Sequence, residues 1–243
     1  MQIIYSTREE IGIIELNNPP YNQLTSPDFI NLTELSEFLN RDDIKGVIIT
    51  GSGKNFCAGA DLNILKDQIK DQSRFKKQMD GGKQIINMIY TSPIPVAAAV
   101  RGSCLGAGLE IALACHFICA SKNAMFGFPE TGLNLIPGLG GTVLSRKINR
   151  SQTVSLLLSA QMINGEEAQK IGLVDRLYPT KDLITGTFEY LMALISDKPV
   201  ELIKTIMQSI HNSEILSRDE ALKYETKNFI KLARQLIESD PDK

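Results

Sequence analysis

Two glutamates carry the clearest sign of chemistry in this sequence of 243 residues. Glu110 and Glu130 stand twenty positions apart, each in an apolar stretch with glycine-rich backbone beside it. A carboxylate in such surroundings needs a partner or a purpose, because burying an unpaired charge is costly. One explanation is a buried ion pair, with Arg101 or Lys122 as the partner, or a contact with a helix end. The matching flanks favour the other explanation, an acid–base pair that acts on a neutral carbon skeleton.

Backbone N–H groups are the second candidate for chemistry. A strand, a turn rich in small residues and a helix start follow one another at residues 47–62 and again at residues 96–110. The start of a helix presents N–H groups and favours negative charge. Two such donors that converge on one oxygen form an oxyanion hole. The alternative is that the small residues only permit close packing of a helix on a strand.

Several other catalytic patterns are missing. The turn at residues 106–108 has two glycines of a dinucleotide fingerprint, but Ile111 stands in the place of the third, and no Walker-type glycine-lysine-serine/threonine segment occurs. No G-x-S-x-G segment is present for a serine nucleophile. His116 is expected to be a hydrogen-bonded structural residue and His211 a surface residue. Neither has suitably spaced partners, so we expect no metal site.

Composition and charge exclude further classes. The net charge of −2 and the pI near 5.8 predict neither a nucleic-acid partner nor an anionic membrane surface. No apolar run is long enough to span a membrane, and the first residues are strand-like, so we expect no signal peptide. The four cysteines lack zinc-ligand spacing and are expected to be buried, reduced thiols in a cytoplasmic protein.

Strands alternate with helices over the first three quarters of the chain, which predicts an α/β fold. Residues 47–50 are uniformly apolar, so this strand is expected to be covered on both faces. Ser26, followed by Pro27, is expected to cap a helix, and Asp61 is expected to cap a short helix that begins there. The polar stretch 66–82 is expected to be mobile. The remaining expected strands are residues 2–6, 11–16, 96–100, 117–120 and 173–177, and the remaining expected helices are residues 83–90, 142–147, 152–159 and 166–171.

From residue 182 onward the pattern is helical. Two amphipathic helices, within residues 200–210 and 221–236, carry apolar faces that should pack on the rest of the chain or on a neighbouring subunit. We therefore divide the chain into an α/β core at residues 1–181 and a helical region at residues 182–243.

Four segments together resemble the crotonase superfamily, the enoyl-CoA hydratases and isomerases. They are residues 17–22 (NNPPYN), 51–62 (GSGKNFCAGADL), 102–114 (GSCLGAGLEIALA) and 126–141 (FGFPETGLNLIPGLGG). The resemblance covers about residues 2–180. It implies an α/β fold whose core is a superhelix, or spiral, of ββα units, with a helical C-terminal trimerisation region. Members of this superfamily often assemble as trimers or as dimers of trimers.

The resemblance also implies roles for single residues. Ala60 and Ala107 match the two residues whose N–H groups form the oxyanion hole around the thioester carbonyl. Glu110 and Glu130 match the two glutamates of true hydratases. Gly138 matches a backbone donor that helps to hold the water. The positions that match the lining of the CoA-binding groove are Ala58, Asp61 and Leu62. CoA is part of the substrate, so no separate cofactor is implied.

Two positions depart from the superfamily pattern. Ala107 stands where many members have glycine, which requires a negative φ there, and His116 replaces a common aspartate.

The resemblance leads first to an enoyl-CoA hydratase that adds water across the α,β double bond, or catalyses the reverse dehydration. The alternatives are a Δ3,Δ2-enoyl-CoA isomerase and a decarboxylase or dehydratase that acts on CoA or carrier-protein thioesters. A non-enzyme alternative is an acyl-CoA-binding scaffold subunit. The sequence does not determine the length or branching of the acyl chain.

Overall fold

A sheet of six strands forms the centre of the molecule. The structure is a computed structural model and describes residues 1–141 and 147–239. The strand order is β1-β2-β3-β4-β6-β9; β1 and β2 form an antiparallel hairpin and the other neighbours pair in parallel. These strands are β1 (Gln2–Arg8), β2 (Ile11–Asn17), β3 (Gly46–Gly51), β4 (Val96–Val100), β6 (Phe117–Ser121) and β9 (Arg176–Tyr178). A small second sheet contains β5 (Ser103–Leu105), β7 (Met125–Gly127) and β8 (Ile163–Asn164).

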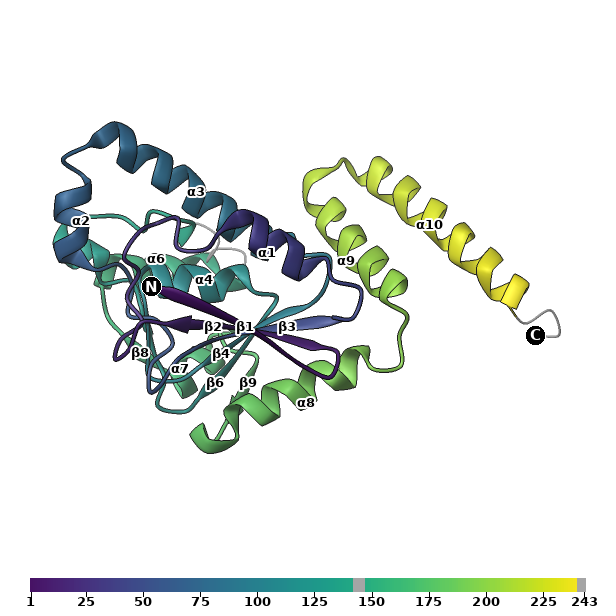
Figure 1. The fold of residues 1–243 in the computed structure, drawn as a ribbon, viewed down its shortest axis with the longest axis horizontal. Coiled ribbons are helices and arrows are strands. Elements are labelled where there is room, and N and C mark those ends of the chain that lie inside the picture. The colour runs from purple at the N-terminus through teal and green to yellow at the C-terminus, as the bar shows by residue number, and fades with distance from the viewer. Residues whose placement is uncertain (142–146, 240–243) are drawn as a thin grey trace.

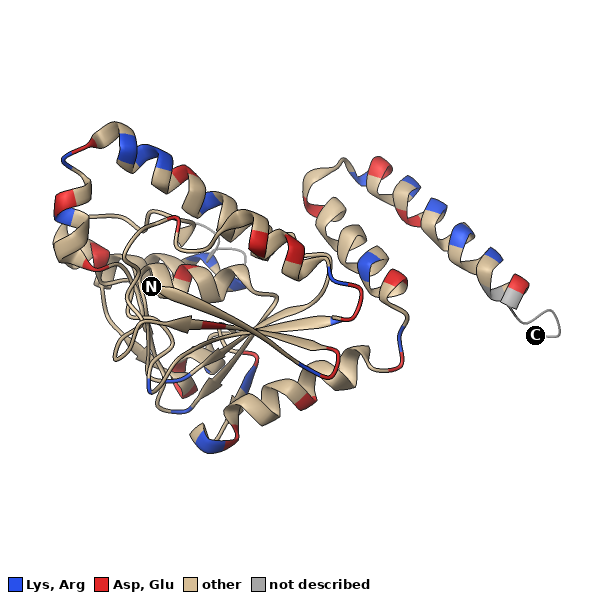
Figure 2. Ribbon diagram, viewed as in Figure 1, with Lys and Arg blue, Asp and Glu red and all other residues tan. Residues whose placement is uncertain are grey.

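Helices cover both faces of the large sheet, as Figure 1 shows. On one face α8 (Leu183–Ile195) packs against the strands, and on the other lie α1 (Leu32–Leu39), α3 (Gln72–Tyr90) and α4 (Ala107–Ala114). β3 and β4 are buried along their whole length, so the prediction of a doubly covered strand is confirmed. Figure 2 shows that these two strands carry no charged residue, whereas both signs of charge are interspersed along α3 and α10.

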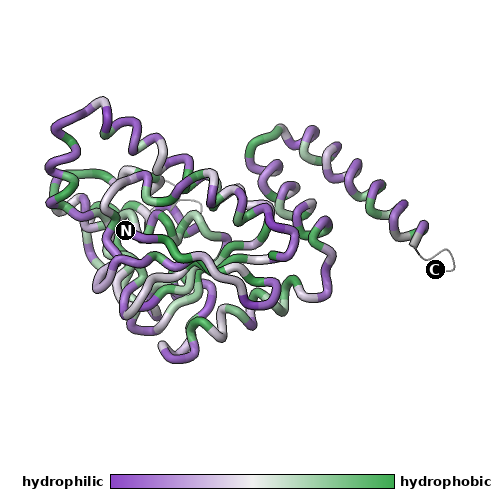
Figure 3. The backbone as a smooth tube through the Cα atoms, in the orientation of Figure 1, coloured by the Kyte–Doolittle hydropathy of each residue, from purple (hydrophilic) through white to green (hydrophobic). Residues whose placement is uncertain are grey.

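The remaining helices lie around this core and beyond it. They are α2 (Leu62–Gln68), η1 (Pro129–Leu133), α6 (Arg150–Ser159), α7 (Gly165–Lys170), η3 (Thr180–Asp182), α9 (Val200–Ile215) and α10 (Arg218–Ser239). α10 runs beside α9 at the edge of the molecule (Figure 1). Figure 3 shows hydrophobic and hydrophilic residues alternating along α10. The division at residue 181 stays a prediction, and α8 itself packs on the sheet.

Most of the expected elements are present, and three differ. The helix expected to begin at Ser26 begins at Leu32, because Asn31 is its cap and accepts hydrogen bonds from the backbone N–H groups of Thr33 (2.9 Å) and Glu34 (3.2 Å). The Ser26 hydroxyl instead donates to the carboxylate of Asp28. A cap must bond N–H groups of the first turn, so the side chain that does so decides where the helix begins.

The stretch 66–82, expected to be mobile, is largely helical. It contains the end of α2 and the first half of α3, and Asp71 caps α3 by accepting from the N–H of Arg74 at 3.0 Å. The strand expected at 173–177 begins later, at Arg176. Leu173 and Val174 donate their N–H groups to the carbonyl of Ala168 and so finish α7 instead. The helix expected at 142–147 lies, except for its last residue, outside the described residues.

A buried asparagine ties the loop after β2 to the turn after β3. Asn22 is fully buried, and its side-chain amide donates to the carbonyls of Ser52 and Asn55, both at 2.8 Å. Its side-chain oxygen accepts from the N–H of Asn18 at 3.0 Å. The asparagine therefore joins the loop after β2 to the segment that leads into residues 57–62.

We predict that Asn22→Ala lowers the free energy of unfolding by about 2 kcal/mol or more, because it leaves buried carbonyl and N–H groups without partners. Urea denaturation measures this loss. The control is Asn40→Ala, since Asn40 is exposed and donates only to the carbonyl of Ser36. Equal losses for the two variants would contradict the role given to Asn22.

Candidate active site

Glu110 is buried, with 2% of its surface exposed, in the first turn of α4. Its Oε1 accepts three hydrogen bonds, from the backbone N–H groups of Leu139 (2.8 Å), Gly140 (2.6 Å) and Gly141 (2.8 Å). We call residues 139–141 the amide cradle. Burial raises the pKa of Glu110, and the three N–H groups oppose that rise because they stabilise the carboxylate.

The basic residues considered as partners of Glu110 are occupied elsewhere. Arg101 donates to the backbone carbonyls of Gly51 (2.9 Å) and Gly53 (2.6 Å). Lys122 forms an ion pair with Glu166 at 3.0 Å. The charge of Glu110 is therefore balanced by backbone dipoles and by no ion pair among the described residues.

Glu130 has a different environment. It lies in the first turn of η1, a short 3-10 helix where a loop was expected. Its Oε2 is buried and has no hydrogen-bond partner within the described part of the chain. Burial raises the pKa of Glu130 to about 7, and the charge of Glu110 adds to the rise. The protonation of each carboxyl group therefore depends on the charge of the other.

A glycine lets Glu130 approach the start of α4. Gly106 has φ +51, a left-handed conformation that L side chains rarely adopt, and a Cβ at this position would collide with Oε1 of Glu130. Replacement of Gly106 by any larger residue would therefore displace the carboxyl group.

The two glycine-rich turns lie side by side. The N–H of Cys57 donates to the carbonyl of Ser103 (2.9 Å), and the carbonyl of Cys57 accepts from the N–H of Leu105 (3.0 Å). This short parallel pairing sets Ala60 and Ala107 at equivalent positions, each three residues beyond the Cys57–Cys104 bridge.

The backbone at both alanines leaves an N–H group available. Ala107 is the first residue of α4, where a helix provides no intrahelical acceptor. At the other turn, the carbonyl of Gly59 accepts a hydrogen bond from the N–H of Leu24, and the N–H of Asp61 donates one to the carbonyl of Leu24. Because successive N–H groups of an extended segment point to opposite sides, the N–H of Ala60 faces away from Leu24. These are the donors that an oxyanion hole needs.

One cavity of about 610 Å³ is bordered by every residue that the resemblance placed in the catalytic or CoA-binding site. They are Ala58, Ala60, Asp61, Leu62, Ala107, Glu110, Glu130 and Gly138. Asp61 caps α2, as expected, by accepting from the N–H groups of Asn63 (2.9 Å) and Ile64 (3.3 Å). Gly138 lies against the side chain of Met79.

The sequence interpretation missed two parts of this site. One is the amide cradle, whose glycines were noted but not connected with Glu110. The other is the wall formed by α3, where Phe75 and Met79 line the cavity within a stretch expected to be mobile. The spacing of four residues between these two apolar side chains, in otherwise polar sequence, is a helix signal that could have revealed it.

His116 and the cysteines are structural. The Nδ1 of His116 accepts a hydrogen bond from the backbone N–H of Val96 (2.9 Å), and the backbone N–H of His116 donates one to the Val96 carbonyl (2.9 Å). The residue therefore holds the start of β6 against β4. Burial lowers its pKa to about 4. The four cysteines are free and buried. His211 is half-buried, so its expected surface position is wrong.

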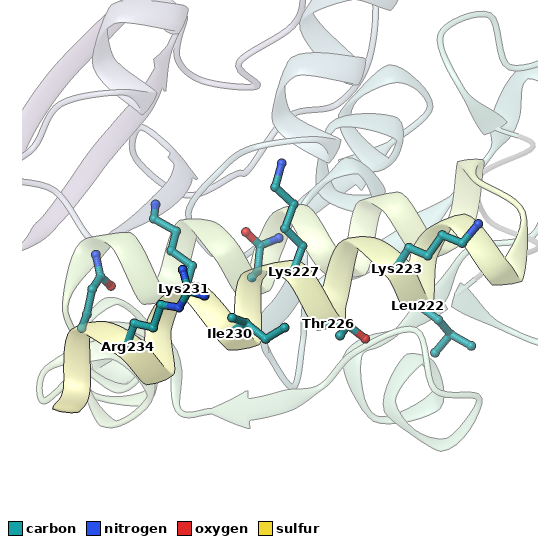
Figure 4. A pocket seen from close by; sticks show the side chains of 9 residues that line it. Leu222, Lys223, Thr226, Lys227, Ile230, Lys231 and Arg234 are labelled. Carbon is teal, nitrogen blue, oxygen red and sulfur yellow. The ribbon is translucent and has the colours of Figure 1, made fainter. Parts of the chain in front are cut away.

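A second cavity, of about 850 Å³, lies along α10, and basic residues of this helix line it. Figure 4 shows Lys227 and Lys231 pointing to one side of the helix and Leu222 and Thr226 to the other. No described carboxylate lines this second cavity.

No metal site is found in the described part of the chain: among residues 1–141 and 147–239, no group of three His, Cys, Asp or Glu side chains could hold a metal ion. No described helix is long and apolar enough to cross a membrane.

Solved structures identify the fold. The chain is similar to the crystal structure of an enoyl-CoA hydratase from Polaromonas sp. JS666, with a TM-score of 0.86 and 28% identity over 94% of this chain and 90% of that one. The α/β fold with a crotonase-type spiral core and a helical C-terminal region, predicted from the sequence, is therefore confirmed.

The chain belongs to the enoyl-CoA hydratase/isomerase family, whose model matches residues 6–239. It is 32% identical to the short-chain-enoyl-CoA hydratase of Clostridium acetobutylicum over 231 residues, which cover 93% of this chain and 87% of that protein. It is 30% identical to the peroxisomal fatty acid beta-oxidation multifunctional protein AIM1 of Arabidopsis thaliana over 95% of this chain. That match covers 32% of the plant protein, so the chain spans about a third of its length.

The raised pKa of Glu130 predicts a pH-dependent stability. Between the ordinary value of 4.5 and about 7, the folded chain keeps a proton on Glu130 that the unfolded chain has lost. The contribution of this residue to the free energy of unfolding therefore falls as the pH rises through that window. We predict that Glu130→Gln, which cannot ionise, gains thermal stability relative to the unsubstituted protein between about pH 5 and pH 8.

Melting temperatures of the two proteins at a series of pH values measure the difference. Glu189→Gln is the control for the same substitution away from the cavity, because Glu189 is exposed on α8. A difference for Glu130→Gln that is constant over the same pH range would show that this carboxyl group is not held protonated by its surroundings.

Proposed function

We propose that this protein is an enoyl-CoA hydratase, which adds water across the α,β double bond of a 2-enoyl-CoA thioester or catalyses the reverse dehydration. One observation carries the proposal: two glutamates in unlike environments border the same cavity as the turns at Ala60 and Ala107. Hydration needs a base for the water, an acid for the α carbon and donors for the thioester oxygen, and these four residues could supply all three.

The mechanism follows from the two environments. The N–H groups of Ala60 and Ala107 would bind the thioester oxygen and stabilise the negative charge that develops there. The three donors of the amide cradle favour the carboxylate form of Glu110, so Glu110 would accept a proton from water. Glu130, whose pKa is raised to about 7, would hold the proton that passes to the α carbon. The hydroxide would bond to the β carbon, and dehydration reverses each step.

Gly138 would donate its N–H to the water, and Ala58, Asp61 and Leu62 would border the CoA group. These roles rest on the match to the superfamily pattern and on the position of all four residues at the cavity. The carboxylate of Asp61 already caps α2, so its part in binding would be through backbone and packing. The only group that the reaction requires besides the protein and water is the thioester itself.

A second function is favoured by one feature of Glu110. Its Oε1 accepts three backbone hydrogen bonds, so the residue could serve only to fix the amide cradle. Glu130 alone would then move a proton between two carbons, and the protein would be a Δ3,Δ2-enoyl-CoA isomerase.

We predict that Glu110→Gln lowers crotonyl-CoA hydration by about 10²–10⁴-fold, the usual worth of general acid–base catalysis. The amide oxygen of glutamine can still accept from the cradle, but it cannot take a proton from water. Isomerisation of a 3-enoyl-CoA to the 2-enoyl-CoA should be largely retained. Glu130→Gln should lose both reactions, because no group then exchanges the α proton.

Loss or gain of the conjugated-enoyl absorbance measures both activities, and Glu189→Gln again serves as the control. If Glu110→Gln hydrates at the full rate while Glu130→Gln is inactive, the isomerase is the better assignment. If the unsubstituted protein catalyses neither reaction, the acyl-CoA-binding scaffold is the better assignment.

We also propose that the protein assembles as a homotrimer or a dimer of trimers. Within the described residues α10 packs mainly on α9, and apolar side chains such as Ile210 (54% exposed) and Phe229 (72% exposed) remain uncovered in the single chain. Apolar surface of this extent favours association.

Sedimentation velocity at micromolar concentration should therefore give the mass of three or six copies of the 26.8 kDa chain. Phe229→Asp should shift the distribution toward smaller species, because it would bury a charge in the contact. Sedimentation as a monomer by the unsubstituted protein would refute the assembly.

A further inference from the structure

Most of the active-site cavity beyond the catalytic groups is lined by hydrocarbon. One wall comes from α2 and α3, and the other comes from η1 and the residues that follow it. The large apolar side chains of the two walls, apart from Leu62 at the proposed CoA group, are Leu65, Ile69, Phe75 and Met79 on the first, and Leu133, Leu135, Ile136 and Leu139 on the second.

Of the polar side chains that line the cavity beyond the two glutamates, all except that of Gln23 are engaged within the protein. Asp61 caps α2. The side-chain amide of Gln68 donates to the carbonyl of Thr25 at 3.0 Å, and the hydroxyl of Ser26 donates to Asp28. Among the described lining residues there is no lysine, arginine or histidine. A charged acyl chain would therefore leave water without gaining a partner of opposite charge, which is costly.

Several of the apolar side chains remain open to solvent. Ile136 is 82% exposed, Ile69 52% and Leu133 51%. Covering such surface with hydrocarbon is favourable in proportion to the area removed from water. A four-carbon acyl group would have its first three carbons at the oxyanion donors and the two glutamates. Only its terminal methyl group would then remain to cover the two walls.

We propose that the acyl group of the substrate is an uncharged aliphatic chain longer than four carbons, of about eight to ten, which lies between α2–α3 and η1. This inference rests on the proposed hydratase function and names the substrate class of the same site. The cavity volume of about 610 Å³ is within the range of about 300–1,000 Å³ that is usual for small-molecule sites.

The test is a series of 2-enoyl-CoA substrates with four, six, eight and ten carbons, assayed by the conjugated-enoyl absorbance. The CoA group is common to the series, so the ratio of kcat/KM values isolates the acyl chain. Each methylene that leaves water completely contributes up to about four-fold. We expect at least about a ten-fold rise in kcat/KM from four to ten carbons, and little turnover of the CoA monothioester of an unsaturated C5 dicarboxylic acid.

The outcomes separate the two proposals. A kcat/KM that is flat or falls with chain length overturns the inference and leaves the hydratase function standing. Efficient turnover of the dicarboxylic thioester overturns it as well. Absence of hydration for every member of the series refutes the proposed function itself.

A pair of variants tests the location of the chain. Ile136→Asp places a charge on the wall, and Leu158→Asp is the matched control, because Leu158 is also apolar and exposed (75%) but does not line the cavity. We expect Ile136→Asp to lower the ten-carbon to four-carbon ratio of kcat/KM by about ten-fold or more, and Leu158→Asp to leave this ratio unchanged.

Sedimentation of both variants provides the second readout. If Ile136→Asp changes the oligomeric state and lowers kcat/KM equally for all chain lengths, a second copy of the chain covers this wall. The inference is then wrong, since the wall would not be available to the acyl group.

Discussion

The carboxylate of Glu110, buried at the start of α4, is the constraint on which the site depends. No ion pair among the described residues balances it, so the backbone must supply its donors, and it does so through residues 139–141. That requirement fixes the position of the amide cradle. Gly82 of α3 allows Leu139 to pack close to the helix, because a Cβ there would lie 2.8 Å from Leu139 Cδ2. Helix α3, which lies far from residues 139–141 in sequence, thereby supports the amide cradle.

Close approach of backbone to backbone is the second condition. A Cβ on Gly108 would lie 2.9 Å from the carbonyl carbon of Cys57, and a Cβ on Gly59 would lie 2.9 Å from the carbonyl oxygen of Leu105. Glycine at these two positions lets the 57–60 and 103–108 segments lie against each other, so that two amide donors can serve one oxygen. The small residues that suggested close packing and those that suggested an oxyanion hole are the same residues, so the close packing is confirmed and the oxyanion hole stays a proposal.

The two glutamates differ in the hydrogen bonds that their carboxyl groups accept from the backbone. Glu110 accepts three N–H groups, whereas Oε2 of Glu130 is buried without a partner in the described part of the chain. Two carboxyl groups that lie close together do not both ionise readily, and hydrogen bonds to the charged form favour ionisation of the group that accepts more of them. In the proposed hydratase, these unlike surroundings would divide the work of base and acid between two residues of the same type.

The sequence alone determined the α/β fold, the doubly buried strand β3, the cap at Asp61 and the pair of glutamates, because these follow from local periodicity and residue type. It did not determine that Asn31, and not Ser26, begins α1, nor that α3 forms a wall of the cavity. It also left the partner of Glu110 open between a basic side chain and a helix end. Tertiary packing decided these features. Several caps or hydrogen-bond donors are possible from the sequence, and the folded chain brings only one of them within hydrogen-bonding distance.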